Sequence, residues 1–195
     1  MVKTLYPTFQ HWSSRGRVWV TSDTHFDDPD CKLMNPDWPH PMVLANRLNS
    51  PIGKQDTLVC LGDVGDASYI RHIHCRHKVL LLGNHDRGAS YYNEWFDETY
   101  TGPLIVAEKL ILSHEPVDLG GTPWAFNIHG HCHGHYNDLF MEPYHYNVAV
   151  DVMDWKPLNL GEFLKTGVLK NVTSLHRQTI DNAGGEKDGK IFSSC

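Results

Sequence analysis

The feature that most constrains the fold of this chain is a short apolar run that meets a glycine and three polar residues. The run covers Val79–Leu82, and it is followed directly by Gly83, Asn84, His85 and Asp86. A run of this length beside a glycine is typical of a strand that is buried on both faces. The polar residues offer an amide oxygen, an imidazole and a carboxylate. The stretch therefore indicates a buried strand that delivers reactive or metal-binding groups to a site.

The chain repeats this pattern with different polar residues after each apolar run. Further strands are expected at Val18–Thr21, Thr57–Leu61, Leu110–Leu112 and Phe126–His129. In open α/β sheets, ligands bind outside the carboxyl ends of the strands. If these strands share a sheet edge, seven side chains converge there: Asp23, His25, Asp63, Asn84, His114, His131 and His133. Residues i and i+2 of an extended segment point the same way, so the Asp-x-His and His-x-His pairs can each converge on one site.

The residue types in this set are those of a transition-metal site. Carboxylate, imidazole and amide ligands together suit Mn, Fe, Zn or Ni better than Mg or Ca, which prefer all-oxygen shells. Seven ligands exceed what a single tetrahedral zinc ion needs. The set therefore fits two divalent transition-metal ions that share one carboxylate. We expect Mn²⁺, with Fe, Zn or Ni as alternatives.

The composition is that of a soluble globular protein. The chain has 195 residues, of which 41% are hydrophobic and 21% charged. We expect one domain over residues 1–180 and a mobile C-terminal tail over 181–195. The net charge of −6 argues against general binding to nucleic acids. Five Cys without CxxC spacing, an N-terminus without an apolar signal segment and no run long enough to span a membrane favour a cytoplasmic protein.

Other elements are expected between and after these strands. The predicted helices and loops are Met42–Leu48 (helix), Asp66–Ile73 (helix), Tyr91–Asp97 (helix or loop) and a helix that begins near Pro157. The region Tyr100–Leu112 looks like a hairpin, and Asn147–Val150 like a strand that ends in Asp151.

Taken in order, five motifs resemble the signature of the calcineurin-like metallophosphoesterases. They are Asp23-x-His25, Gly62-Asp63, Gly83-Asn84-His85-Asp86, His114 and Gly130-His131-x-His133. The resemblance runs from about residue 18 to residue 151 and is greatest to the small, uncapped bacterial and phage members. It implies an α/β fold (α+β in some schemes), a two-sheet β-sandwich flanked by helices, with metals at one edge of the sheets.

The resemblance also implies a role for each site residue. One metal would be held by Asp23, His25, Asp63 and His133, and the other by Asp63, Asn84, His114 and His131. Asp63 would bridge the two, and a hydroxide between the metals would attack phosphorus in line. His85 resembles the general acid that protonates the leaving oxygen. Asp66 lies where some members place a carboxylate that orients this imidazole, with a simple helix N-cap as the alternative.

Substrate contacts are expected from Asn84, His85 and Arg87, although a surface role is the alternative for Arg87. Protein serine/threonine phosphatases continue the second motif with Asp-Arg-Gly and end the third in Glu. This chain has Asp66-Ala67-Ser68 and Asp86 instead, so a protein phosphatase is not expected.

Other histidines and cysteines have simpler interpretations. Cys132 is expected to be a small packed residue, and His129 and His135 to support the ligands or line the rim. The motif His72-x-His74-Cys75-x-His77 lacks a distant partner pair, so we interpret it as a solvated helix end and loop.

The function expected from this set is hydrolysis of phosphodiester bonds in nucleotide-like small molecules. The alternatives are a phosphomonoesterase and a non-catalytic metal-binding scaffold of the same fold. Scaffold members typically lose a ligand or the general acid, whereas all seven ligands and His85 are present here. The expected partner is a small-molecule or nucleotide phosphoester, with no membrane contact. The sequence leaves the oligomeric state open.

Overall fold

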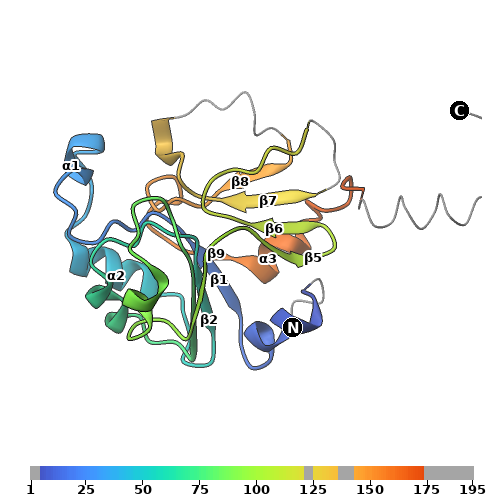
Figure 1. Cartoon of the computed structure of the whole chain (residues 1–195), viewed down its shortest axis with the longest axis horizontal. Helices are drawn as coiled ribbons and strands as arrows, with labels where there is room; N and C mark the ends of the chain where they lie inside the picture. Colours follow the sequence, from blue (N-terminus) through green and yellow to red (C-terminus); the bar gives the residue numbers. More distant parts are fainter. Residues whose placement is uncertain (1–4, 121–124, 136–142, 174–195) are drawn as a thin grey trace, which may run out of the picture.

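The computed structural model describes residues 5–120, 125–135 and 143–173. Two β-sheets face each other across a shared apolar core, and short helices cover the outer face of one sheet (Figure 1). The expected two-sheet sandwich with flanking helices is therefore confirmed. None of the helices in the described ranges is long and apolar enough to cross a membrane. The predicted tail at 181–195 lies outside the described residues.

The first sheet has the strand order β4-β3-β2-β1-β9. Its members are β4 (Glu98–Tyr100), β3 (His77–Leu81), β2 (Thr57–Cys60), β1 (Val18–Thr21) and β9 (Leu158–Asn159). Strands β1 to β4 are parallel, and β9 runs antiparallel to β1. Because the four parallel strands end at the same edge, the loops that follow them are brought together.

The second sheet has the order β5-β6-β7-β8. Its strands are β5 (Leu104–Ala107), β6 (Leu110–Leu112), β7 (Phe126–His129) and β8 (His145–Asn147). The predicted hairpin is present as the antiparallel pair β5 and β6, whereas β6, β7 and β8 are parallel. A parallel bridge joins Ser22, just after β1, to Ala149, just after β8. Because β6, β7 and β8 are parallel, their carboxyl ends reach the same edge as those of the first sheet.

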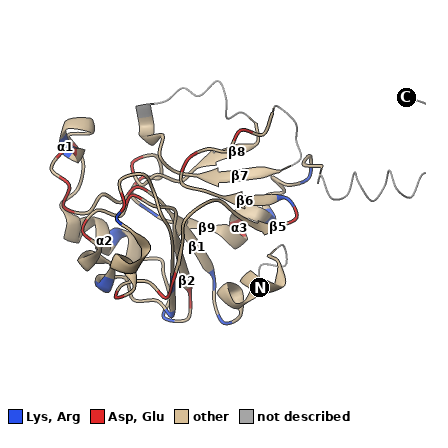
Figure 2. Ribbon diagram, viewed as in Figure 1, with Lys and Arg blue, Asp and Glu red and all other residues tan. Residues whose placement is uncertain are grey.

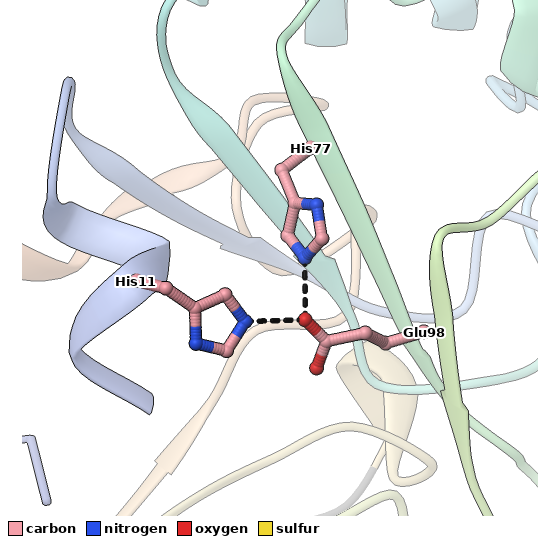
Figure 3. Close-up of side chains that lie close together, drawn as sticks. All are labelled: His11, His77 and Glu98. Carbon is pink, nitrogen blue, oxygen red and sulfur yellow. Dashed lines mark hydrogen bonds and ion pairs between the residues drawn. The ribbon is translucent and has the colours of Figure 1, made fainter. Parts of the chain in front are cut away.

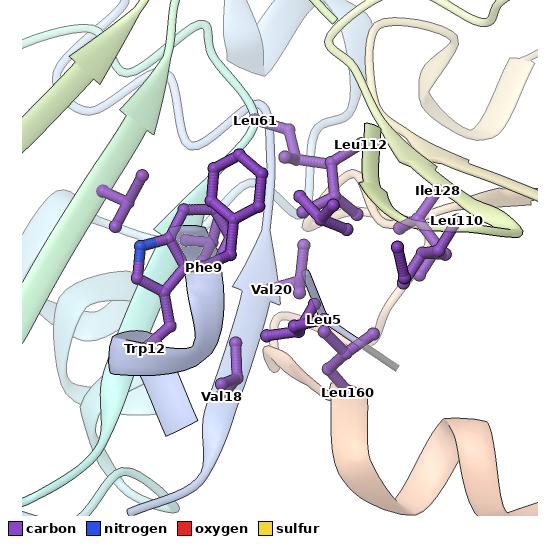
Figure 4. Packing of buried hydrophobic residues seen from close by; sticks show 14 of the residues in the cluster. Leu5, Phe9, Trp12, Val18, Val20, Leu61, Leu110, Leu112, Ile128 and Leu160 are labelled. Atoms are coloured by element: carbon purple, nitrogen blue, oxygen red, sulfur yellow. The ribbon is translucent and has the colours of Figure 1, made fainter. Parts of the chain in front are cut away.

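Successive side chains along the strands of the first sheet point to opposite faces, and each face borders a separate apolar core. Val18 and Val20 point toward the second sheet and share a core with Leu110, Leu112 and Ile128 of that sheet (Figure 4). Trp19 and its neighbours on the opposite face pack under a layer of short helices: α2 (Pro41–Asn49), η2 (Ala67–His72) and η3 (Ala89–Tyr92). The remaining helices are η1 (Pro7–Ser13), α1 (Cys31–Met34), η4 (His133–His135) and α3 (Leu160–Lys165).

Several predicted boundaries differ from the structure. The helix expected over Asp66–Ile73 is a 3₁₀ turn, Ala67–His72, and only Ala89–Tyr92 is helical near the segment predicted from Tyr91. The last predicted strand is displaced, since β8 ends at Asn147 and residues 148–150 pair only through one isolated bridge. Cys31, Cys60, Cys75 and Cys132 are free thiols, as the absence of a disulfide pattern predicts. Figure 2 shows Lys and Arg scattered among separate loops and helices, with acidic residues between them.

Candidate metal centre

The seven predicted ligands gather where strands of both sheets end. Asp23 and His25 follow β1, Asp63 follows β2, and Asn84 follows β3. The second sheet supplies the other three ligands, His114 after β6, and His131 and His133 after β7. The carboxylates are deeply buried, with Asp23 0% and Asp63 2% exposed, whereas Asn84 and His131 are open to solvent. The centre therefore has a closed inner side and an open outer side.

Five of these residues have left-handed backbone conformations. The φ angles are 56° for Asp23, 38° for His25, 50° for Asp63, 66° for His131 and 44° for His133. Residues other than glycine rarely adopt this region, and such conformations cluster at functional sites. The loops after β1, β2 and β7 thus turn sharply and direct their side chains to one place.

Two glycines allow the backbone to approach the carboxylates closely. A Cβ atom on Gly83 would lie 2.2 Å from Asp63 Oδ1. A Cβ atom on Gly130 would lie 2.0 Å from Ser22 Oγ and 2.2 Å from Asp23 Oδ2. Any larger residue at either position would displace a carboxylate of the centre.

The first group of ligand atoms belongs to Asp23, His25 and His133. One donor atom of each residue lies within 4.8 Å of the others. His133 Nε2 is 3.8 Å from Asp23 Oδ1, and the two imidazole rings are 5.3 Å apart. A carboxylate with two imidazoles at this spacing could hold one metal ion.

The second group belongs to Asp63, His114 and His131, with Asn84 beside them. His114 Nε2 lies 2.8 Å from Asn84 Oδ1, 3.3 Å from Asp63 Oδ2 and 3.3 Å from His131 Nδ1. His131 Nδ1 is 3.1 Å from the same Asn84 oxygen. Four donor atoms of the types that bind transition metals therefore converge at this point.

Asp63 lies between the two groups. Its Oδ2 atom is 3.3 Å from His114 Nε2 in the second group and 3.7 Å from His25 Nε2 in the first. His25 Nε2 is buried and has no hydrogen-bond partner among the described residues, which is costly for a polar atom unless a ligand satisfies it. The residues present thus could hold metal, and this unsatisfied nitrogen is an atom that a metal would complete.

The opposite ring nitrogens of three imidazoles are held by neighbouring acceptors. Asp28 Oδ2 is 3.2 Å from His25 Nδ1, and Asp151 Oδ1 is 3.1 Å from His133 Nδ1. The Leu61 carbonyl oxygen is 2.8 Å from His114 Nδ1. Such contacts fix the tautomer and leave Nε2 free to bind a metal. No sequence pattern pointed to Asp28, and Asp151 was noted only as the end of a predicted strand.

Asp86 stabilises the loops that carry the ligands. Its Oδ2 atom accepts the backbone N–H groups of Asp63 (2.9 Å) and Gly83 (2.8 Å). Its Oδ1 atom accepts the N–H of Val64 (2.9 Å) and the hydroxyl of Tyr92 (2.8 Å). One carboxylate thus joins the loop after β2 to the loop after β3, a role that sequence reasoning missed.

Charge and burial act against each other in the centre. Burial raises the pKa of Asp23, although Ser22, His114 and His133 favour its ionised form. Burial also opposes ionisation of Asp63, but the hydrogen bond and charge of His114 lower its pKa. Burial lowers the pKa of His114, yet Asp63 and Asp23 raise it overall. A metal that binds His114 must displace the proton on its imidazole, so metal affinity should fall in acid.

His85 stands at the open side of the centre. Its backbone N–H donates to Asp63 Oδ1 (2.9 Å), its side chain is exposed, and its ring lies 5.9 Å from that of His25. A cavity of about 490 Å³ adjoins it, and Asp66, Arg87 and Tyr91 also line this space. The Arg87 guanidinium lies 4.5 Å from the centre of the Tyr91 ring.

The structure places Asp66 at the N-cap of η2. Its carboxylate accepts the N–H of Ser68 (2.9 Å), and among the described residues no hydrogen bond joins it to His85. The capping alternative therefore accounts for its geometry, although it lines the same cavity as His85.

The residues within and beside the last motif can be compared with expectation in part. His129 is fully buried in β7, with Nδ1 2.8 Å from the Gly130 carbonyl oxygen, so it does not line the rim. Cys132 is buried, as predicted for a packed residue. The side chain of His135 lies outside the described set.

Comparisons with known proteins were made by sequence and by structure. No curated protein sequence matches the chain. A protein of unknown function, AQ665 from Aquifex aeolicus, is similar in structure, with 26% identity and a TM-score of 0.61 over 77% of this chain and 98% of that one. The Pseudomonas putida nuclease MPE has 24% identity and a TM-score of 0.44, with 63% and 64% covered. A single mutant of Vps29 from Entamoeba histolytica has 19% identity and a TM-score of 0.38, with 67% and 72% covered.

The sequence model of the calcineurin-like phosphoesterases matches residues 16–192. This range contains both sheets and every residue of the candidate centre. The chain therefore belongs to the calcineurin-like phosphoesterase family.

Proposed function

We propose that this protein hydrolyses phosphodiester bonds in nucleotide-like small molecules with two divalent metal ions, Mn²⁺ in the first instance. The observation that carries the proposal is the position of Asp63, whose Oδ2 atom is 3.3 Å from His114 and 3.7 Å from His25. A carboxylate between two ligand groups is the arrangement that a pair of metals requires. When bound, the metals would lower the pKa of a water molecule and neutralise charge on the phosphoryl oxygens.

The chain's own residues would bind and orient the substrate. His131 of the second ligand group and the adjacent Asn84 are exposed, so a phosphate oxygen approaching from solvent meets them first. His85 lies on the same open side and is suited to give a proton to the leaving oxygen. The planar guanidinium of Arg87 would stabilise a second phosphate or a charged substituent in the adjoining cavity.

The shape of the surface favours a diester. One cavity of about 490 Å³ lies beside His85, and another of about 300 Å³ is lined by Asn84, His114 and Glu115. A phosphate held at residues 84 and 85 would thus have space on both sides, which suits two substituents on phosphorus. A monoester would leave one of these spaces empty, so a phosphomonoesterase is the second candidate.

A substrate panel would test this proposal. The protein would be stripped of metal, reconstituted separately with Mn²⁺, Zn²⁺, Fe²⁺ or Ni²⁺, and assayed with bis(p-nitrophenyl) phosphate, p-nitrophenyl phosphate, linear dinucleotides and cyclic nucleotides. We expect metal-dependent hydrolysis with a larger kcat/KM for diesters than for monoesters. Asp63→Asn serves as the inactive control, because it preserves the size of the side chain and removes its charge.

Two results would contradict the proposal in different ways. A larger kcat/KM for monoesters would favour the phosphomonoesterase. Binding of two metals without turnover of any ester would favour the non-catalytic scaffold.

A further inference from the structure

A second group of metal-ligating side chains lies at the opposite end of the first sheet. His77 is the first residue of β3 and Glu98 the first of β4, so both lie at the amino ends of their strands. His11 reaches them from η1 (Figure 3). β3 has five residues, so its two ends lie roughly 13 Å apart, with this group at the first end and the loop that carries Asn84 beyond the other. The group is therefore independent of the proposed hydrolytic site.

Both imidazoles point at the same carboxylate oxygen. His11 Nε2 and His77 Nε2 each lie 2.5 Å from Glu98 Oε1, and the two rings are 5.4 Å apart. The other oxygen, Oε2, accepts a hydrogen bond from the Tyr100 hydroxyl (2.6 Å), and Trp12 Nε1 lies 3.3 Å from both Oε1 and Oε2. The Tyr100 bond holds Oε2 away from the imidazoles, so that Oε1 faces both of them. Oriented carboxylates of this kind are typical of metal sites.

The surroundings of His77 favour a metal on its Nε2 atom. Its Nδ1 atom is 3.5 Å from Asp97 Oδ2, while Nε2 faces Glu98, so carboxylates lie on both sides of the ring. A neutral imidazole carries one N–H and satisfies only one of them as a donor. With a metal on Nε2, the remaining proton at Nδ1 faces Asp97, which is the carboxylate–histidine–metal arrangement.

From this geometry we infer that His11, His77 and Glu98 form a separate site for one Zn²⁺-like divalent transition metal. Two imidazoles and one carboxylate are a known ligand set for tetrahedral zinc, with the fourth position left to water. That position would face solvent on the side of His11, whose side chain is 46% exposed, compared with 16% for His77 and 19% for Glu98.

The metal would fasten η1 to the sheet. Phe9 and Trp12 of η1 belong to the core between the sheets, while His11 contributes from its exposed side. Tetrahedral zinc bonds place neighbouring ligand atoms about 3.3 Å apart. Both contacts of 2.5 Å would have to widen by about 0.8 Å. The exposed His11 is free to move away from Glu98, and the contact between the less exposed His77 and Glu98 would require a small shift of one of these two side chains.

Zinc stoichiometry would test this inference. The full chain would be stripped with a chelator and titrated with Zn²⁺ in competition with a chromophoric chelator. We expect His11→Asn to bind one equivalent less than the unmodified protein, with affinity for that equivalent reduced at least about 100-fold. His74→Asn is the matched control, since His74 is exposed, lies three residues before His77 and donates to Asn49 through its backbone N–H and not through its imidazole. Glu98→Gln provides a second variant that keeps the shape of the ligand.

The readouts separate this site from the metal centre. The loss caused by His11→Asn should persist in an Asp63→Asn background, and phosphoester hydrolysis by His11→Asn should remain unchanged. In zinc-soaked crystals, an anomalous peak should lie among His11, His77 and Glu98. Equal zinc stoichiometry in His11→Asn and His74→Asn, or no peak at this position, would overturn the inference and leave a hydrogen-bonded triad.

Discussion

Replacement of Asp86 by alanine should destabilise the protein by about 4 kcal/mol. The carboxylate accepts three backbone N–H groups and the Tyr92 hydroxyl, at distances of 2.8–2.9 Å. A hydrogen bond to an ionised acceptor contributes about 1.5–3 kcal/mol when buried, but Asp86 is only half-buried, so we take about 1 kcal/mol for each. The four contacts then give the total. Tyr92→Phe removes one of them, together with the bond that the Tyr92 hydroxyl accepts from the Arg87 N–H, and should cost about 1–2 kcal/mol.

Urea unfolding followed by tryptophan fluorescence would measure these differences. Glu162→Ala is the control, because its ion pair with Lys165 is exposed and should contribute less than about 1 kcal/mol. The Asp86→Ala variant should also bind metal more weakly, since the backbone of Asp63 loses its anchor. If Asp86→Ala cost less than about 1 kcal/mol, or no more than Tyr92→Phe, the role assigned to this carboxylate would be wrong.

Three further predictions concern the centre and the pH dependence of stability. Asp63→Asn should reduce hydrolysis more than Asn84→Ala or His114→Asn, and excess metal should restore activity partly in the latter two but not in Asp63→Asn. His85→Asn should retain both metals and lose alkyl or nucleoside ester cleavage by about 10²–10⁴-fold, but lose much less with nitrophenyl esters; equal losses would indicate phosphate positioning instead. Burial opposes ionisation of Asp56, but hydrogen bonds from Trp19 and two backbone N–H groups lower its pKa. The free energy of unfolding should therefore fall as the pH drops below about 4, and a slope that Asp56→Asn leaves unchanged would contradict this assignment.

The sequence was sufficient to predict that the seven candidate ligands gather at one edge, because each lies in the loop that follows a strand. Apolar runs locate strands, and parallel strands bring their carboxyl ends to one edge, so Asp63 and Asn84 could be placed without a structure. The reason offered for the pairing of Asp23 with His25 was nevertheless wrong. It assumed extended backbone, whereas both residues have positive φ angles. The two side chains converge because the loop turns sharply after β1.

Contacts between distant segments could not be predicted in this way. Asp86 follows a strand like the ligands do, but its partners are backbone N–H groups, which leave no trace in the residue type. His77 was interpreted as part of a solvated helix end and loop because its motif lacks a distant partner pair in the sequence, whereas it is the first residue of β3. Its partners, His11 and Glu98, come from segments on either side of it in the sequence, and only the assembled sheet brings them together.

The wide spacing of the ligands along the chain has a consequence for folding. The N–H of His131 donates to the Asp23 carboxylate across 108 positions, so the first ligand group cannot exist before the second sheet has docked on the first. Contacts of such high sequence separation form slowly, because the entropy of closing a long loop must be overcome first. During synthesis, the chain would have to emerge past His133 before a high-affinity centre could assemble. Metal uptake would therefore report the completion of folding, and early folding intermediates would leave the metal free in solution.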